Sequence, residues 1–242
     1  MNYVRKERLM KEPAVLLLSG GPDSSTLAFD LVKNQGKKVL ALTFNFGEKE
    51  AKAEIESAKK IAVELGIEHH IVDFSDSMRE FYGLPNPQYM RKVAGPNLYS
   101  DETTLENSYD VQPFGSAIAL LMAASWGLKQ GARSIYYAVH YNDTIYFDNK
   151  VSYFKLLGVV TSSCEGDEYA MDFQVPYLKM LKSEVIALGH SLGLDLSETW
   201  SCASSDEIHC GTCEPCIDRR EAFKQAHIAD TTVYANNSLT VE

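Results

Sequence analysis

The chain has 242 residues, of which 45% are hydrophobic and 23% charged, a composition that excludes a disordered protein and supplies enough apolar side chains for a sizeable core. Its formal net charge of −10 argues against a broad nucleic-acid-binding surface, because phosphate binding depends on clustered Lys and Arg. No apolar run approaches the roughly 20 residues of a membrane span, so we expect a cytoplasmic protein without a membrane partner.

The first third of the chain alternates short apolar runs with segments of helical periodicity. Residues 13–18 form a continuous apolar run, which predicts a parallel strand buried on both faces. The further elements predicted in this part are a helix at 26–33, a strand at 37–46, a helix at 48–65 ended by Gly66, and a strand at 67–74. This βαβαβ order predicts an α/β fold with a doubly wound parallel sheet.

The middle of the chain is less regular. Residues 75–110 are rich in Pro, Asn, Ser and Tyr and show no clear period, so we expect a long, partly irregular insertion. The elements predicted after it are a buried helix at 114–128, strands at 134–139 and 171–175, and a helix at 182–192.

The glycine pair after the first predicted strand lies in the string Ser19-Gly20-Gly21-Pro22-Asp23-Ser24-Ser25. A strand, a glycine-rich loop and a helix in this order gather backbone N–H groups and a helix N-terminus around one point, which favours anion binding. No lysine follows as in a Walker A loop, so the loop suits a pyrophosphate leaving group better than γ-phosphate transfer. Asp23 can position Mg²⁺ on the phosphates. The alternative is a tight turn in which Asp23 or Ser24 only caps the helix.

This string resembles the PP-loop of the ATP-pyrophosphatases, enzymes that attack the α-phosphate of ATP and release pyrophosphate. The resemblance implies that ATP is a co-substrate and that an acid is adenylated rather than phosphorylated. The residues that it assigns to the nucleotide are Ser19, Gly20, Gly21, Asp23, Ser24 and Ser25.

Four of the five cysteines lie close together near the C-terminus, and they are Cys202, Cys210, Cys213 and Cys216. Their spacing, C-x₇-C-x₂-C-x₂-C, lets four thiolates converge on one Zn²⁺, and a site closed by four sulfurs is structural because no position is open for water. An iron–sulfur cluster is the alternative, since C-x₂-C-x₂-C also occurs in such proteins. His209 could replace one sulfur, although a solvent-facing histidine is the simpler interpretation.

Three further stretches resemble the 7-cyano-7-deazaguanine synthases of queuosine biosynthesis. They are Thr43-Phe44-Asn45-Phe46-Gly47-Glu48, the segment from Pro176 through Lys182-Ser183-Glu184, and Thr199-Trp200-Ser201-Cys202 through Cys216 and Arg219. Together with the PP-loop, the resemblance spans most of residues 13–225. It implies an adenine-nucleotide α-hydrolase-like, Rossmann-like fold. It also implies an enzyme that activates 7-carboxy-7-deazaguanine with ATP, forms an amide with ammonia, and dehydrates the amide to a nitrile after a second adenylation.

The resemblance assigns roles to single residues. Phe44 joins the nucleotide-binding residues, and Lys182 supplies a cation for the charge on the departing pyrophosphate, a catalytic role beside that of Asp23. The alternative for Lys182 is an ordinary surface lysine at the start of a helix.

The chain departs from the family where the substrate is expected. The family's Pro-Phe-Arg-Asn string is replaced by Pro113-Phe114-Gly115-Ser116, and its Tyr-Pro-Asp-Cys string by Tyr146-Phe147-Asp148-Asn149. Asp148 is retained, and its two oxygens suit the adjacent N1–H and amino donors of a guanine-like edge; the alternative is a loop-capping aspartate. These departures open a second hypothesis, in which the activated deazaguanine is transferred to another amine, such as a protein amine in an antiviral defence system.

Two other function classes stay open. A tRNA-modifying PP-loop enzyme should show a basic face or a catalytic cysteine pair, which the acidic total and the isolated Cys164 disfavour. A non-catalytic, zinc-stabilised partner-binding protein would carry a relic loop, against which the intact Asp23 and Ser24 argue. We expect a homodimer, the commonest oligomer, with ATP and a deazapurine as its small-molecule partners.

These features divide the chain into three parts. Residues 13–196 form the PP-loop and substrate domain, 197–228 a zinc-binding segment, and 229–242 a polar, flexible tail.

Overall fold

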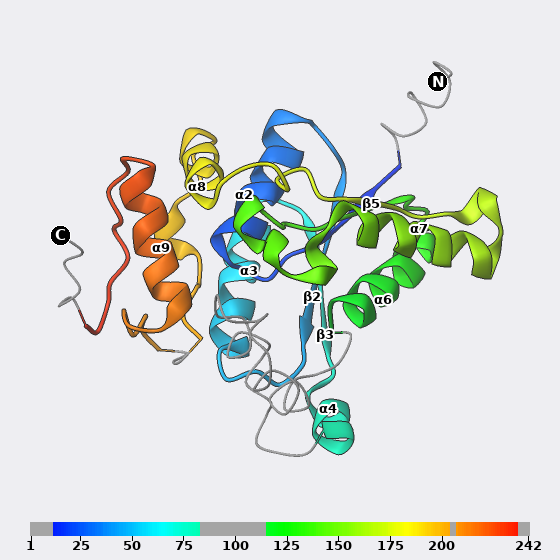
Figure 1. The fold of residues 1–242 in the computed structure, drawn as a ribbon, viewed down its shortest axis with the longest axis horizontal. Helices are drawn as coiled ribbons and strands as arrows, with labels where there is room; N and C mark the ends of the chain where they lie inside the picture. Colours follow the sequence, from blue (N-terminus) through cyan, green and yellow to red (C-terminus); the bar gives the residue numbers. More distant parts are fainter. Residues whose placement is uncertain (1–11, 83–114, 204–206, 237–242) are drawn as a thin grey trace.

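The structure is a computed structural model that describes residues 12–82, 115–203 and 207–236 (Figure 1). Its strands form one sheet in the order β3-β2-β1-β4-β5, in which all neighbours run parallel. The strands are β1 Ala14–Leu17, β2 Val39–Asn45, β3 Glu68–Asp73, β4 Ser134–Tyr136 and β5 Asp172–Gln174. Since β1 lies between β2 and β4, the sheet is doubly wound and has its topological switch point between β1 and β4.

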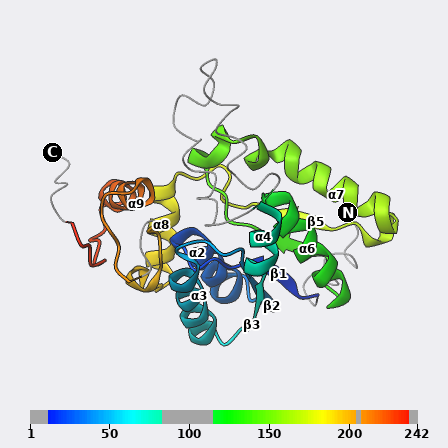
Figure 2. The same ribbon diagram turned by 90° about the horizontal axis from the view of Figure 1, so that it is seen from below.

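Helices cover both faces of this sheet. They are α2 Pro22–Phe29, α3 Ala51–Leu65, α4 Ser75–Tyr82, α6 Gly115–Lys129, α7 Val151–Glu165, α8 Lys182–Ser191 and α9 Glu214–Gln225. Figure 2 shows α2, α3 and α8 on one side of the strands and α6 and α7 on the other. No helix among the described residues is long and apolar enough to cross a membrane.

Side chains of β1 alternate between two hydrophobic cores. Leu16 packs in the core that contains Leu27 of α2, whereas Val15 packs in the core that contains Leu120 of α6. Both faces of β1 are therefore buried, as the continuous apolar run predicts.

A glycine brings α8 close to α2. A Cβ atom added at Gly189 would lie 2.4 Å from Oγ1 of Thr26, so a larger residue there would force the Thr26 side chain to shift. This close packing matters for the site, because α2 begins at the phosphate loop and α8 begins at Lys182.

Several elements differ from the sequence predictions. The helix predicted from residue 26 begins at Pro22, a residue suited to the first helical turn, and it ends in a π-helical turn at Asp30–Asn34. Residues 75–82, predicted as part of an irregular insertion, form α4, whose first backbone N–H donates to Asp73 Oδ1 at 2.8 Å. The remainder of that insertion, residues 83–110, lies outside the described residues.

Helix α7 was not predicted, and its exposure pattern gives the reason. Leu156, Val159 and Val160 are exposed, while only Phe154 and Leu157 of this helix are buried. The apolar residues thus occur all round the helix, and no amphipathic period marks it in the sequence.

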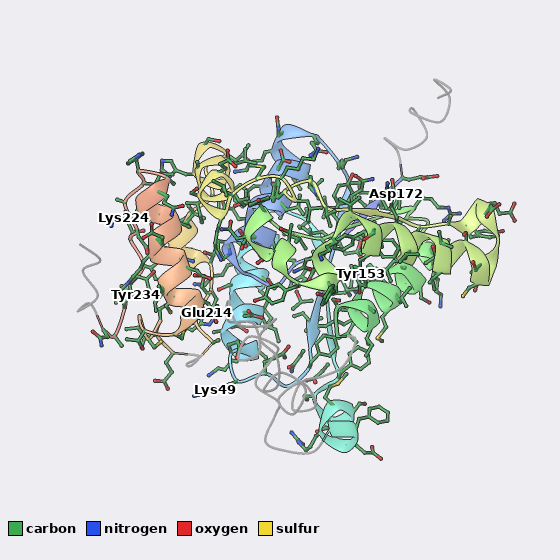
Figure 3. The ribbon with its side chains drawn as sticks, in the orientation of Figure 1. Lys49, Tyr153, Asp172, Glu214, Lys224 and Tyr234 are labelled. Atoms are coloured by element: carbon green, nitrogen blue, oxygen red, sulfur yellow. The ribbon has the colours of Figure 1, made fainter. Side chains whose placement is uncertain are left out.

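The expectation of a flexible tail from residue 229 does not hold for the described part of that tail. The Tyr234 hydroxyl donates to Asp230 at 2.6 Å, and the Ala235 N–H donates to the His209 carbonyl at 2.8 Å. Tyr234 is 8% exposed and lies beside α9 (Figure 3). Residues 229–236 are therefore anchored, because an aromatic ring is buried and backbone groups are paired.

Candidate functional site

The candidate site lies at the switch point of the sheet. The chain leaves β1 into residues 19–25 and leaves β4 into residues 137–143, and both segments follow the carboxyl ends of their strands. Ligands of open parallel sheets bind in the crevice formed at this position.

The phosphate loop is shaped by Gly20. Its φ is +83°, and a Cβ atom there would lie 2.3 Å from the Glu54 carbonyl oxygen and 2.7 Å from the Ala58 nitrogen. Only glycine therefore lets the loop lie against the first turns of α3. After Gly21, which has an extended backbone, α2 begins, so the free N–H groups of its first turn face the loop.

Two serines of the loop hold its conformation. The Ser24 hydroxyl accepts the Ser19 backbone N–H at 3.2 Å and donates to the Gly21 carbonyl at 3.2 Å. The Ser19 hydroxyl accepts the Gly21 N–H at 3.3 Å. Ser25 is fully buried, and its hydroxyl has no hydrogen-bond partner among the described residues.

Four charged or titratable side chains meet beside this loop. Asp23 Oδ2 lies 3.8 Å from Lys182 Nζ and 3.9 Å from His140 Nε2. His140 Nε2 lies 3.4 Å from Asp143 Oδ2, which also accepts the His140 backbone N–H at 3.3 Å. Burial raises the pKa of Asp143, and the opposing charge of His140 is the largest influence that lowers it.

Three polar atoms of this neighbourhood are buried without a hydrogen-bond partner among the described residues. They are Asp23 Oδ1, His140 Nδ1 and the Tyr177 hydroxyl oxygen. Burial, followed by the charges of Asp30 and Asp23, raises the pKa of Tyr177, so its hydroxyl keeps its proton at neutral pH. Because unpaired buried polar atoms cost free energy, their concentration beside an anion loop indicates a ligand site.

Lys182 is the first residue of α8, and it is not a surface lysine. A cation is unfavourable at the positive end of a helix, yet its side chain is only 19% exposed and points to Asp23. Its backbone N–H donates to Asn142 Oδ1 at 3.2 Å, which ties the start of α8 to the segment after β4.

The cysteine sulfurs form a compact group on the C-terminal segment. The sulfurs of Cys202, Cys210, Cys213 and Cys216 all lie within 4.8 Å of one another. Tetrahedral Zn²⁺ with sulfur ligands at about 2.3 Å requires sulfur–sulfur separations of about 3.8 Å. The Cys202 and Cys213 sulfurs are 3.9 Å apart, so the group fits one such ion.

The environment of the sulfurs favours thiolate. Backbone N–H groups of Thr212 and Cys213 donate to Cys210 Sγ at 3.4 and 3.2 Å. A hydrogen bond from the Cys216 thiol lowers the pKa of Cys213 to about 4, and the same bond raises the pKa of Cys216. Such a shared proton is what a metal cation displaces.

His209 is buried rather than solvent-facing, and it does not replace a sulfur. Its Nε2 accepts the Ser201 backbone N–H at 3.1 Å, and its ring lies 4.2 Å from that of Trp200. Burial and the charge of Arg219 lower the pKa of His209 to about 4, so the ring stays neutral.

Trp200 connects the cysteine group to the phosphate loop. Its backbone N–H donates to the Gly20 carbonyl at 2.9 Å, and its indole N–H donates to the Cys202 carbonyl at 2.8 Å. Arg219 of α9, which is fully buried, donates from the other side to Thr199 Oγ1 at 2.9 Å and Ser201 Oγ at 3.1 Å. The C-terminal segment is thus part of the support of the loop.

Comparison with known proteins identifies the family. Residues 13–227 match the family model for queuosine biosynthesis protein QueC. The chain belongs to the QueC family. The 7-cyano-7-deazaguanine synthase of Methanoregula boonei is 35% identical to it, in an alignment that covers 91% of this chain and 98% of the relative. The 7-cyano-7-deazaguanine synthase of Archaeoglobus fulgidus is 34% identical, in an alignment that covers 90% of this chain and 88% of the relative.

A solved structure agrees with the fold. The U34-tRNA thiolase NcsA from Methanococcus maripaludis, which carries a 4Fe–4S cluster, matches 89% of this chain and 68% of its own with a TM-score of 0.52 and 19% identity. The likeness concerns the fold, and it agrees with the α/β, doubly wound sheet predicted for this QueC-family chain.

The structure shows which of the predicted site residues contact one another. Asp23 and Lys182, the two residues predicted to be catalytic, lie 3.8 Å apart. Asp148 instead accepts a 2.6 Å hydrogen bond from Ser116, whose hydroxyl also lies 2.9 Å from that of Tyr153. Tyr153 is labelled in Figure 3, on the first turn of α7. Ser116 belongs to the string that replaces Pro-Phe-Arg-Asn, and Asp148 is the aspartate retained in the string that replaces Tyr-Pro-Asp-Cys, so these two strings are in direct contact.

Phe44 lies at the carboxyl end of β2, in a small aromatic group. Its ring centroid is 5.6 Å from that of Phe46 and 5.9 Å from that of Phe74. A role in nucleotide binding stays a prediction for this residue.

Sequence reasoning missed His140, Asp143 and Tyr177 as site residues. His140 and Asp143 are separated by three positions in a segment that directly follows a strand, which is the signal that could have marked them. Tyr177 gives no such signal, because a single tyrosine is more often a core residue.

Proposed function

We propose that this QueC-family chain adenylates 7-carboxy-7-deazaguanine with ATP, releases pyrophosphate, and passes the acyl group to ammonia to give the amide and then the nitrile. The observation that carries the proposal is Asp23, whose Oδ1 is buried without a partner among the described residues, beside an anion loop and 3.8 Å from Lys182. A carboxylate and a cation in this position suit a nucleotide with its metal better than they suit a structural turn.

The nucleotide half of the site supplies three functions. The N–H groups at the start of α2 bind phosphate oxygens, Asp23 holds Mg²⁺, and Lys182 balances the charge that develops on pyrophosphate. When bound, Mg²⁺ withdraws charge from the phosphate oxygens and makes pyrophosphate a better leaving group. The carboxylate of the substrate then attacks the α-phosphate, and AMP becomes the leaving group of the next step.

The substrate half offers a recess and an acid. A cavity of about 430 Å³ opens next to the turn that holds His140 and Asp143, and its lining consists of Tyr141, Thr144, Lys150, Val151, Val175, Pro176, Leu178 and Lys179. Asp148 follows this turn in the chain, with one oxygen oriented by Ser116. In the proposed role, its carboxylate accepts hydrogen bonds from the guanine-like edge.

For the cysteine group we propose a structural Zn²⁺ ion. Four sulfurs within 4.8 Å of one another suit a single ion, whereas a cube of four irons holds its cysteines farther apart. Metal analysis of purified protein together with its visible absorption tests this assignment. One zinc per chain and no absorption band is the expected result, and a brown, iron-containing protein would contradict it.

The function is tested by incubating the pure protein with ATP, Mg²⁺, 7-carboxy-7-deazaguanine and ammonia. We expect AMP, pyrophosphate, the amide and the nitrile by mass spectrometry. Omission of the carboxy-deazaguanine should abolish AMP formation, and continued AMP formation without it would refute the substrate assignment.

One observation favours a second candidate. Because Ser116 contacts the retained Asp148, the two strings that depart from the family pattern meet in one part of the substrate half. The second candidate retains adenylation but transfers the acyl group to another amine, such as a protein amine. AMP formation that stops before the nitrile, with a deazaguanine adduct on an added amine, would replace the first candidate by the second.

A further inference from the structure

His140 is a buried histidine that the proposed roles of Asp23 and Lys182 do not use. It follows β4 at the switch point, and it is 4% exposed. Its Nε2 faces two carboxylates, Asp143 Oδ2 at 3.4 Å and Asp23 Oδ2 at 3.9 Å. The two ring nitrogens therefore lie in different surroundings.

These surroundings determine which nitrogen carries the proton. Carboxylate oxygens only accept hydrogen bonds, so the N–H of the neutral ring lies at Nε2, toward Asp143 and Asp23. Nδ1 then carries a free electron pair, and it is buried without a hydrogen-bond partner among the described residues. A buried acceptor with no donor is costly, and a bound molecule with an N–H group would satisfy it.

We infer that His140 is the general base of the second half-reaction, accepting at Nδ1 the proton that the attacking amine loses. The inference rests on the proposed function, because it requires an acyl adenylate and an amine. In this role, His140 links the nucleotide half of the site, through Asp23, to the substrate half.

The step balances without a further reactant. The nitrogen electron pair of ammonia forms the N–C bond, and the carbonyl π pair moves to oxygen. The ammonium-like nitrogen gives one proton to His140 Nδ1. The carbonyl then re-forms, the C–O bond to the phosphate breaks, and its electron pair leaves with AMP. The histidine returns the proton to solvent, so acyl adenylate and ammonia become amide, AMP and a proton.

The other groups that face His140 are less suited to this task. Asp23 is engaged with Lys182, and Lys182 is a cation. Asp143 is occupied by the ring and the backbone N–H of His140. Tyr177 keeps its proton, since burial raises its pKa.

The test separates the two half-reactions in His140→Gln. The glutamine amide keeps a donor toward the carboxylates but offers no basic nitrogen. Adenylation is followed by the exchange of labelled pyrophosphate into ATP, which requires the carboxy-deazaguanine but no amine. Acyl transfer is followed by amide formation, with the concentration of unprotonated ammonia held constant at each pH. His190→Gln, at an exposed position of α8, is the matched control.

We expect exchange within twofold of the parent and amide formation lowered by about 10²- to 10³-fold, the usual size of a general-base effect. Amide formation at the parental rate overturns the inference. An equal loss of exchange and amide formation also overturns it, because His140 would then serve only the nucleotide half.

Failure of the proposed function looks different, since the parent itself would then show no carboxylate-dependent exchange. If His140→Gln does not fold, as judged by metal content and thermal unfolding, Asp143→Asn replaces it. This variant keeps the base but removes a carboxylate that orients the Nε2 proton. Amide formation should fall by about tenfold with exchange retained, and unchanged amide formation would refute the inference.

Discussion

The two halves of the candidate site are built in different ways. On the nucleotide side, backbone geometry fixes the loop: Gly20 fits against α3 only without a side chain, and its carbonyl accepts the Trp200 N–H. In the substrate half, side chains contact side chains, as in the pairs of His140 with Asp143 and of Ser116 with Asp148. A backbone-built half tolerates few residue types, whereas a half built from side chains can change its chemistry by substitution. The departures from the QueC-family pattern fall in the second half.

The largest effect is expected from the residue that faces the nucleotide side. Lys182→Ala removes the cation beside Asp23, and kcat should fall by about 10²- to 10³-fold, as when one group that stabilises developing charge is lost. Carboxylate-dependent pyrophosphate exchange measures this effect. Lys129→Ala, which changes an exposed lysine at the end of α6, should leave exchange unchanged, and an equal loss in both variants would contradict the assignment to Lys182.

Metal removal tests whether the nucleotide half depends on the C-terminal segment. A strong chelator should release the metal, loosen the segments 200–203 and 207–216, and weaken ATP binding by about tenfold or more, because the support of Gly20 is lost. In a Trp126→Phe background, fluorescence reports Trp200 alone, since the chain has two tryptophans. ATP affinity that survives complete metal loss would show that the phosphate loop does not depend on the metal-bound cysteine segment.

Trp200→Phe makes the same comparison by one hydrogen bond. An aromatic ring stays at this position, although a smaller one, and the indole N–H that donates to the Cys202 carbonyl is removed. The expected change is about 1 kcal/mol, or roughly fivefold in ATP affinity. Metal content should remain at one per chain. Trp126→Phe is the control, and calorimetric titration with ATP is the measurement. Equal affinities of the two variants would refute a link through the indole.

Ser116→Ala addresses the acceptor side. Loss of the hydroxyl leaves Asp148 and Tyr153 without their shared partner, so KM for carboxy-deazaguanine should rise by about three- to tenfold while KM for ATP stays constant. Steady-state kinetics with each substrate varied distinguishes the two constants. A change confined to KM for ATP would place Ser116 in the nucleotide half and contradict this assignment.

The smallest effect concerns His69, which supports the strand end before the loop. Its Nε2 lies 2.7 Å from the Thr43 hydroxyl, which in turn donates to the Leu18 carbonyl. Burial lowers the pKa of His69, so as the pH falls the unfolded chain takes up this proton before the folded one does. Stability should therefore decrease as the pH drops below the usual histidine range. His69→Asn should reduce the difference between urea midpoints at neutral and mildly acidic pH, and an unaltered difference would exclude this histidine as its source.

The same contrast explains how much the sequence predicts. The strand at residues 14–17, the glycine loop and the cysteine spacing are set by local requirements, namely burial on both faces, a positive φ and ligand geometry. Each of these requirements selects residue types at neighbouring positions, so each is legible in a single sequence.

The rest depends on positions far apart in the chain. Ser116 and Asp148 are 32 positions apart, and nothing near either one indicates the other. His140 comes close to Asp23 only because the sheet order places β4 next to β1. Helix α7 was missed because its exposed valines and leucine hide the helical period.

The hydrogen bond from Trp200 to Gly20 also has a consequence for biosynthesis. A ribosome makes the phosphate loop early and its supporting residue late, so a nascent or truncated chain that ends before Trp200 contains the whole loop without its support. Such a chain contains β1 to β5, but by the proposed function it should not hold ATP tightly until the cysteine segment has emerged. In the proposed function, the C-terminal segment would thereby delay ATP binding until the residues that follow the sheet have been made.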